Sequence, residues 1–389
     1  MNENVSIFLN ASRWLAAVAV LISHVRHLIL VDLVGVTNKT LLCKVFYFIT
    51  GLGHEAVIVF FVISGFLVGG HTWERWRNEG PRLRSFVSAR VSRIYTVLIP
   101  ALLVGLGFDA IGLHWINASE LYTNALKYHT ISLDNTLSGT LNLGTFIGNL
   151  FMLQGILCGN LGSNSPLWSL SYEWWYYCLF GLVALSTFAS PKRRVVYVAL
   201  AGSLVLVLPM KFVVWGSIWG LGIAAYMWIK YSRWRPHPLL GMVTLIVAVG
   251  VSRLSHNTSN VAHREPISIE FIRDIFLGIG YVVALVSTSR LSLRIPGVRI
   301  NERLAAFSYT TYLCHFPVVM LLVSVGFQWF GLDLQVQPTV YGVAYFFGLC
   351  ITIFAYCFLF SLVTERHTAQ VRNRLNSLLA VRKLSGAGV

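Results

Sequence analysis

Long apolar runs separated by short polar segments recur along the whole chain. A helix needs about 20 mostly apolar residues to cross the hydrocarbon core of a bilayer. We predict ten such helices, at approximately 7–34, 52–71, 92–113, 167–189, 195–209, 211–230, 238–254, 270–289, 304–326 and 338–364. The fifth is the shortest and must turn tightly at Pro209–Lys211 into the sixth. The pattern therefore predicts an all-α, polytopic integral membrane protein.

The segments between these runs leave no room for a second, soluble domain. The longest, about 114–166, mixes polar residues, aromatic residues and glycines, and a basic tail follows the last run at 365–389. We expect a single transmembrane domain over 1–389, with its core at about 7–364 and no appended soluble domain.

The distribution of charge orients the predicted helices. The protein is 56% hydrophobic and 12% charged, with 30 lysines and arginines, 15 acidic residues and a net charge of +15. Twenty basic residues fall on the same side as the N-terminus, six fall on the other side, and four lie within or at the ends of spans. Because cytoplasmic loops carry an excess of lysine and arginine, both termini are predicted to be cytoplasmic. Orientation and anionic lipid headgroups then account for the charge, and no nucleic-acid partner is expected.

The first apolar run carries an arginine and a histidine eleven residues apart, Arg13 and His24. Eleven steps of about 100° return the two side chains to nearly the same helix face, roughly 16 Å apart along the axis. A buried arginine in a bilayer costs at least about 2.5 kcal/mol, so such residues usually face a polar cavity. An arginine that reaches the inner interface, with a histidine bonded to a neighbouring helix, fits the spacing equally well.

Two further motifs lie near the inner ends of predicted spans. Arg90 and Arg93 fall where the third span begins, and their spacing of three puts both guanidinium groups on one side of the helix. Two planar guanidinium groups suit a phosphate ligand, although an ordinary pair at the membrane interface has the same pattern. Gly65 and Gly69 are four residues apart, which indicates close approach of another helix backbone.

Two ionisable residues lie deeper in the predicted spans. Glu173 falls about two turns into the fourth span, where an acid is costly unless it is paired or protonated. Its aromatic neighbours also fit an interfacial belt. His315 lies at mid-membrane beside Pro317, which breaks the helix. It is either a catalytic histidine or a structural one that caps the freed carbonyl groups.

The six cysteines indicate little chemistry. Only Cys43 and Cys158 fall on the outer side. They could form a disulfide in an oxidising compartment, but we expect free thiols. The histidines and cysteines show no zinc-type spacing, and neither a glycine-rich nucleotide loop nor a Gly-x-Ser-x-Gly motif occurs. No metal is therefore expected.

Together these segments resemble the membrane acyltransferase family three, which includes bacterial O-acetyltransferases of lipopolysaccharide, exopolysaccharide and Nod factor. The resemblance runs from Arg13 to about Glu365 and keeps the order of the family's motifs. Those motifs are matched by Arg13 with His24, Phe60–Phe66, Arg90 with Arg93, Trp168–Glu173 and Tyr309–Pro317. Where the family often has a second acid followed by Gln-Phe-Tyr, this chain has Trp174–Tyr177, so we expect a more aromatic acceptor pocket.

The resemblance implies a multi-pass O-acyltransferase of the bacterial inner (plasma) membrane. It would move an acyl group, usually acetyl, from cytoplasmic acetyl-CoA to a hydroxyl of a cell-surface or lipid-linked saccharide. His24 would take the hydroxyl proton or carry the acyl group, with Glu173 and Arg13 as further catalytic residues. The residues expected to bind coenzyme A are Arg90, Arg93, Ser64 and Tyr95. Those expected to bind the acceptor are Trp168, Trp174, Tyr172, His315 and Tyr312.

Other functions remain compatible with the residues. A proton-coupled secondary transporter could use His24, Glu173 and Arg13 as a proton relay, but we see no internal repeat that would favour it. An acyltransferase whose acceptor is a lipid or a protein is a third hypothesis. The acceptor, the acyl group, an acyl-histidine intermediate and a homo-oligomer all stay open.

Overall fold

The computed structural model describes residues 2–128, 137–255, 266–291 and 297–385. Over these ranges the chain forms helices and no β-strand, with isolated bridges at Leu30–Val336 and Gln154–Cys158. The longer helices are α1 (Glu3–Ile29), α5 (Leu83–Trp115), α7 (Leu167–Phe188), α8 (Pro191–Val207), α9 (Met210–Tyr231), α10 (Pro238–Ser255), α11 (Ile267–Thr288), α13 (Ser308–Phe330), α14 (Val340–Val363) and α15 (Thr368–Ser385). The shorter ones are α2 (Leu41–Thr50), α3 (Gly53–Ser64), α4 (His71–Glu79), α6 (Leu143–Leu150) and α12 (Val298–Ala305). The all-α prediction is confirmed.

Seven helical stretches in the described ranges are long and apolar enough to cross a membrane. They are α1, α5, α9, α10, α13, the stretch Leu41–Glu79 from α2 to α4, and the stretch Val340–Leu378 from α14 into α15. The other three predicted spans correspond to α7, α8 and α11, which are helices but are not among these seven. A multi-pass helical protein is therefore supported, while the count of ten stays a prediction.

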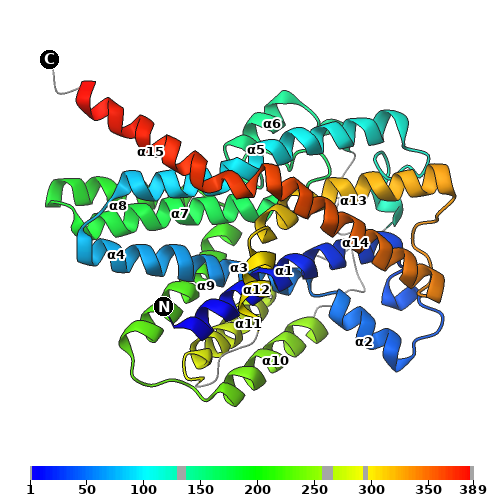
Figure 1. Ribbon diagram of the computed structural model, residues 1–389, viewed down its shortest axis with the longest axis horizontal. Helices are drawn as coiled ribbons and strands as arrows, with labels where there is room; N and C mark the ends of the chain where they lie inside the picture. Colours follow the sequence, from blue (N-terminus) through cyan, green and yellow to red (C-terminus); the bar gives the residue numbers. More distant parts are fainter. Residues whose placement is uncertain (1, 129–136, 256–265, 292–296, 386–389) are drawn as a thin grey trace.

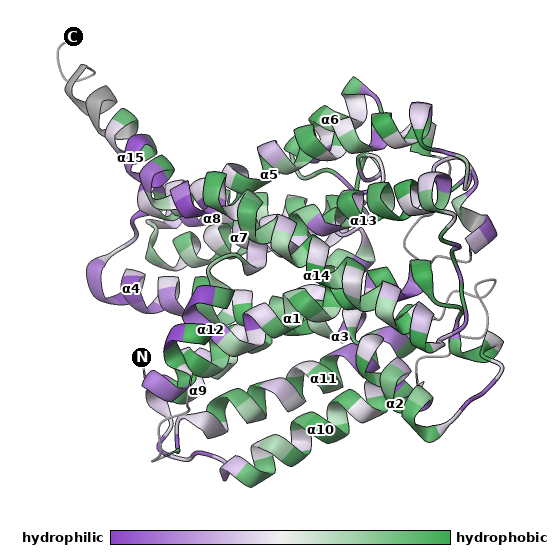
Figure 2. Ribbon diagram, turned by 45° about the vertical axis from the view of Figure 1, so that its right-hand side comes forward, coloured by the Kyte–Doolittle hydropathy of each residue, from purple (hydrophilic) through white to green (hydrophobic). Residues whose placement is uncertain are grey.

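Helix α1 runs through the middle of the bundle and packs against α3, α11, α12, α13 and α14 (Figure 1). The start of α1 and the end of α15 lie toward the same end of the molecule. Hydrophilic segments gather at that end, around α4, α12 and the first part of α15, whereas the long helices are mostly hydrophobic (Figure 2). The cytoplasmic location of both termini stays a prediction. Arg264 and Arg294, two of the basic residues counted for orientation, lie outside the described residues.

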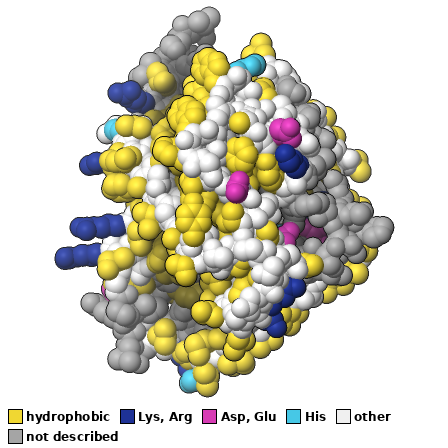
Figure 3. Space-filling model, turned by 90° about the vertical axis from the view of Figure 1, so that its right-hand side faces the viewer, with side chains coloured by type: hydrophobic (Ala, Val, Ile, Leu, Met, Phe, Trp, Pro, Cys, Tyr) yellow, Lys and Arg dark blue, Asp and Glu magenta, His cyan; other side chains and the backbone are white. Residues whose placement is uncertain are grey.

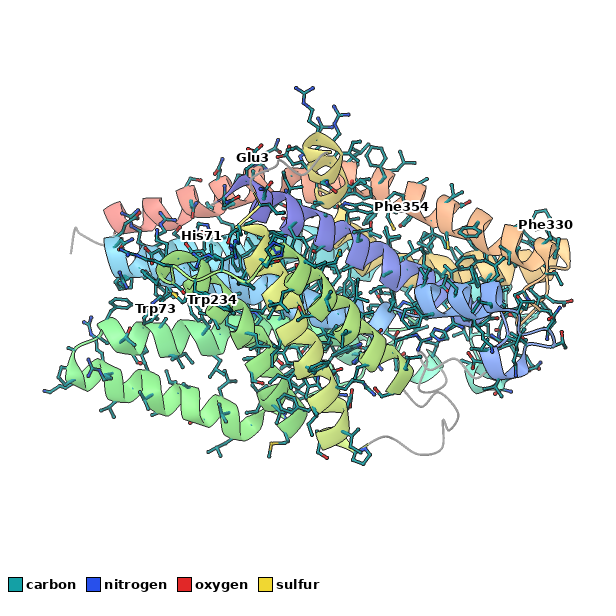
Figure 4. The ribbon with its side chains drawn as sticks, turned by 90° about the horizontal axis from the view of Figure 1, so that it is seen from below. Glu3, His71, Trp73, Trp234, Phe330 and Phe354 are labelled. Atoms are coloured by element: carbon teal, nitrogen blue, oxygen red, sulfur yellow. The ribbon has the colours of Figure 1, made fainter. Side chains whose placement is uncertain are left out.

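The outside of the bundle is largely apolar, as a protein surrounded by lipid requires. Exposed hydrophobic side chains occur along the long helices, for example Ile351 and Leu359 of α14. Figure 3 faces the end of the bundle that lies at the right in Figure 1, and hydrophobic side chains are spread across that face too. Trp234 and Phe330 are exposed and lie toward opposite ends of the molecule (Figure 4). Aromatic side chains at both ends fit the two membrane–water interfaces.

Helix α9 crosses the segment after α3 at very close range. Gly65–Gly70 forms a π-helical turn, and a Cβ added to Gly65 would lie 1.8 Å from the backbone oxygen of Trp219. A Cβ on Gly222 of α9 would lie 2.1 Å from the backbone oxygen of Val62. The close backbone approach predicted from Gly65 and Gly69 is therefore present, and only glycine fits on either side of this crossing.

The structure differs from the predicted elements in three places. Helix α5, with 33 residues, extends the third predicted span, 92–113, mainly at its N-terminal end. α2 and α4 extend the second predicted span, 52–71, at both ends. The segment after 364 continues as α15, which packs on α5, where the Ser88 hydroxyl donates to Asn376 at 2.7 Å.

Cys43 and Cys158, the two cysteines predicted to lie on the outer side, are both free thiols.

Candidate active site

A polar cavity of about 560 Å³ lies among α1, α3, α5, α7, α13 and the start of α15. Its charged side chains are Arg13, Arg90, Arg93, Glu173, Glu365, Arg366 and Arg372. Arg366 and Arg372 are exposed, so the mouth of the cavity lies at the start of α15. Five arginines against two glutamates give a formal excess of three positive charges, which suits an anionic ligand.

Glu365 fixes Arg93 in the cavity wall. The Arg93 guanidinium donates to Glu365 at 2.6 Å and lies 4.8 Å from the ring centre of Tyr309. The other Glu365 oxygen accepts from the backbone N–H and the hydroxyl of Thr310, both at 2.9 Å. Because the first N–H groups of a helix have no partner within it, this buried carboxylate both caps α13 and neutralises Arg93.

Arg90 is less constrained than Arg93. Its guanidinium lies 5.6 Å from the ring centre of Tyr177, and no ion pair of Arg90 occurs in the described part of the chain. Its Nε is buried without a hydrogen-bond partner. A positive group that is partly desolvated and lacks a counter-charge favours an incoming anion.

Glu173 ends a chain of directed hydrogen bonds. The Trp219 indole N–H donates to the Ser64 hydroxyl at 3.1 Å, and Ser64 and Tyr177 are bonded at 3.1 Å. The Tyr177 hydroxyl in turn donates to the Glu173 carboxylate. Tyr177 comes from the segment that replaces the family's second acid, so here a phenol supports the glutamate.

His24 and His315 lie together outside the cavity. Their rings stack at 5.1 Å between centres with an interplanar angle of 8°, and His24 Nδ1 lies 2.8 Å from His315 Nε2. Phe316 packs edge-on against His24 at 4.9 Å. His315 is fully buried, whereas His24 keeps partial exposure.

Tyr312 links the cavity wall to this histidine pair. Tyr312 and Phe60 both line the cavity, and their rings meet edge to face at 5.4 Å. The ring centre of Tyr312 is also 6.4 Å from that of His315. Its hydroxyl is bonded to the Ser169 hydroxyl at 2.6 Å and donates to the Pro166 carbonyl at 3.2 Å. Tyr312 therefore lies beside both the cavity and the His315 ring, and Phe60 packs against Tyr312 in the cavity wall.

Besides His315, four of the predicted binding residues do not line the cavity. Tyr95 donates to the Leu150 carbonyl at 2.8 Å and packs edge-on against Trp174 at 5.8 Å. Trp168 packs edge-on against Tyr172 at 5.1 Å, and both rings contact Phe61 of α3. In this conformation these aromatic residues fill the space between helices.

A second polar cluster lies apart from the cavity, and spacing along the sequence did not indicate it. His54, Glu270 and Asp274 bring three potential metal-ligand atoms within 4.8 Å of one another. Asp274 accepts from His54 at 2.8 Å and from the Trp215 indole at 2.9 Å, and Glu270 pairs with Lys211 at 2.7 Å. Because protein donors already satisfy both carboxylates, ion pairing accounts for this cluster.

Fold and site together define a multi-pass membrane protein with an arginine-rich cavity whose wall adjoins a histidine pair. The family model of acyltransferase family three, described as an acyltransferase domain, matches residues 6–362. The chain therefore belongs to this family and is a membrane acyltransferase. No curated protein and no solved structure matches it significantly.

Several cavity residues were not found by sequence reasoning. Glu365, Arg366 and Arg372 lie just beyond the segment that the family model matches. In the sequence they belong to a basic tail, and only the packing of α15 on α5 brings them to the cavity. Tyr177 gave a weak signal, because it follows Glu173 by one helical turn.

Proposed function

We propose that the protein is an O-acyltransferase that takes an acetyl group from cytoplasmic acetyl-CoA. The observation that carries this proposal is the cavity with an excess of three positive charges, whose far wall adjoins a histidine pair. Coenzyme A combines a phosphate-rich nucleotide with a long thin arm, and so suits a cavity with arginines at its mouth and aromatic side chains in its wall.

The nucleotide phosphates would bind near the mouth, on Arg90, Arg366 and Arg372, with Arg93 held beside them by Glu365. Charge-assisted bonds from arginine to phosphate are strong and directional. The arm would then extend past Arg13 and place the thioester near Tyr312. Rotation of the Tyr312 and Phe60 rings would let the acyl end reach His24.

At His24 the chemistry needs a base that takes the proton of the attacking hydroxyl and an acid that gives a proton to the leaving thiolate, and one histidine can serve as both. His24 would take the proton from the acceptor hydroxyl while the hydroxyl oxygen attacks the thioester carbonyl. The tetrahedral intermediate would collapse with loss of the coenzyme A thiolate, which takes the proton back from His24. The acyl group ends on the acceptor oxygen, and His24 returns to its neutral form.

The acceptor is proposed to be a hydroxyl of a cell-surface or lipid-linked saccharide at the bacterial inner membrane. The partial exposure of His24 supports access from a side other than the cavity. Aromatic residues near the start of α7, including Trp168 and Trp174, offer flat faces of the kind on which sugar rings stack.

Binding of coenzyme A to the full-length protein in detergent tests the donor site. Arg90→Ala should weaken binding by about 1.5–3 kcal/mol, the value of a hydrogen bond to a charged group. The matched control is Arg233→Ala, an exposed arginine that does not line the cavity. Equal affinity for the parent and Arg90→Ala proteins in calorimetry would exclude the donor site at this position.

Transfer of radiolabelled acetyl from acetyl-CoA to the membrane saccharide fraction tests the reaction. His24→Ala should lower transfer by about 10²–10⁴, the usual contribution of a general base, while leaving coenzyme A affinity near the parent value. Transfer by His24→Ala within about tenfold of the parent would remove His24 from the mechanism.

A further inference from the structure

The hydrogen bonds of His315 define where its proton lies. His315 Nδ1 is 2.9 Å from the Thr311 carbonyl oxygen and 3.0 Å from that of Tyr312. A carbonyl oxygen can only accept a hydrogen bond, so His315 Nδ1 carries a proton and donates it. This leaves Nε2 of a neutral His315 as an acceptor.

Burial keeps His315 neutral. Its side chain has no exposed surface, and no carboxylate contacts it or His24 among the described residues. An unpaired imidazolium in such a position would carry a large desolvation cost. His24 Nδ1 and His315 Nε2 are 2.8 Å apart. His24 Nδ1–H is therefore the donor of this hydrogen bond, and the lone pair of His315 Nε2 is the acceptor.

The same reasoning leaves one basic nitrogen on His24. With Nδ1 protonated, the lone pair of neutral His24 is on Nε2. No hydrogen bond to His24 Nε2 occurs over the described ranges, and His24 is the more exposed ring of the pair. The free lone pair therefore lies on the atom that a hydroxyl can reach.

Asn164 holds the helix of His315 in place. Pro317 has no N–H, so it leaves the Leu313 carbonyl, four residues earlier, without its helical donor. The Asn164 side-chain N–H₂ donates to that carbonyl at 2.9 Å. The freed carbonyl thus has its own partner, and His315 Nδ1 remains on Thr311 and Tyr312.

We propose that His315 is a positioning residue that holds His24 in the tautomer with its lone pair on Nε2. This inference rests on the proposed function and assigns His315 to His24 rather than to the acceptor. When His24 takes the hydroxyl proton on Nε2, its Nδ1–H stays bonded to the lone pair of His315, which stabilises the imidazolium without accepting the proton. The proton then leaves with the coenzyme A thiolate.

Two substitutions separate this role from simple packing. His315→Gln keeps an oxygen that can accept from His24 Nδ1, whereas His315→Phe keeps a flat ring of similar size and removes the acceptor. His315→Phe should lower kcat at least tenfold with unchanged coenzyme A affinity, and His315→Gln should recover most of that loss. Equal kcat for His315→Phe and the parent protein would overturn the proposal.

Nitrogen-15 NMR of histidine-labelled protein in nanodiscs reads the tautomer directly. The His24 signals, assigned by their loss in His24→Ala, should show a protonated Nδ1 and an unprotonated Nε2 in the parent and a shift toward a protonated Nε2 in His315→Phe. If Nε2 of His24 is the protonated nitrogen in the parent protein, the proposal is overturned, whatever the His315 variants show. If the parent transfers no acyl group, the proposed function fails, yet these signals still report the tautomer.

Discussion

Individual residues in this cavity have separable roles. Arg90 has no counter-charge in the described ranges and is free to meet a ligand, whereas Arg93 is already bound to Glu365 and Tyr309. The sequence presents the two arginines as equivalent members of one motif. Their surroundings differ, because Arg93 is held in the cavity wall by Glu365, whereas Arg90 has no such ion pair in the described ranges and is the arginine for which we propose ligand binding.

Glu365 is the residue whose loss should most affect the wall. Glu365→Ala leaves the Thr310 N–H, the Thr310 hydroxyl and the Arg93 guanidinium without their shared acceptor. Since an unsatisfied buried polar group costs about 1–3 kcal/mol, we expect a clearly lower thermal unfolding midpoint in detergent. The control is Glu302→Ala, an exposed acid on α12. An unfolding midpoint equal to the parent's for Glu365→Ala would contradict this role.

At the scale of elements, the crossing of α9 with Gly65–Gly70 sets the position of Ser64. Ser64 precedes the π-helical turn and accepts from Trp219 of α9. Because the two backbones almost touch, the crossing fixes the start of the hydrogen-bond chain that ends at Glu173. The crossing of α9 with Gly65–Gly70 thus helps to position Glu173 in the cavity as well as to stabilise the fold.

Two glycines of α9 that point to different sides of the helix test this crossing. Gly222→Ala should destabilise the protein by about 1–3 kcal/mol, the usual cost of overpacking, because the added Cβ would overlap the Val62 carbonyl. Gly220→Ala, where a Cβ meets nothing within 4 Å, should be neutral or slightly stabilising. The fraction of monodisperse protein after heating in detergent measures the difference. Equal survival of the two variants would argue against the close crossing.

Sequence reasoning succeeded where the signal is local. Apolar length predicts the helices, and the spacing of Arg90 and Arg93 predicts that they share a face. It could not show that Phe60 of α3 packs against Tyr312 of α13 in the cavity wall, because this contact joins helices far apart in the chain. It also could not distinguish Arg372 from other basic residues of the tail.

At the scale of the whole molecule, the cavity opens at the end where α1, α5 and α13 begin, while His24 lies further along α1. With the predicted orientation, the donor would enter from the cytoplasm and the acyl group would leave nearer the outer face. Whether the acyl group moves from the cytoplasmic toward the outer face thus depends on which side of the membrane each loop faces.

Labelling of single cysteines on intact cells tests this orientation. In a protein lacking Cys43 and Cys158, an impermeant thiol reagent should label Asn142→Cys before α6 and should not label Arg193→Cys at the start of α8. Both positions are exposed, so access depends on sidedness rather than burial. The reverse pattern would invert the bundle and place the reaction at the cytoplasmic face.

The arginines at the mouth carry a consequence for control by metabolism. They would hold the nucleotide end of the donor, which is chemically identical before and after the acetyl group leaves. Interactions that are equally strong with substrate and product do not favour one over the other. Free coenzyme A would therefore compete with acetyl-CoA for the same binding site. The rate of turnover would then follow the ratio of acetyl-CoA to free coenzyme A in the cell rather than the concentration of acetyl-CoA alone.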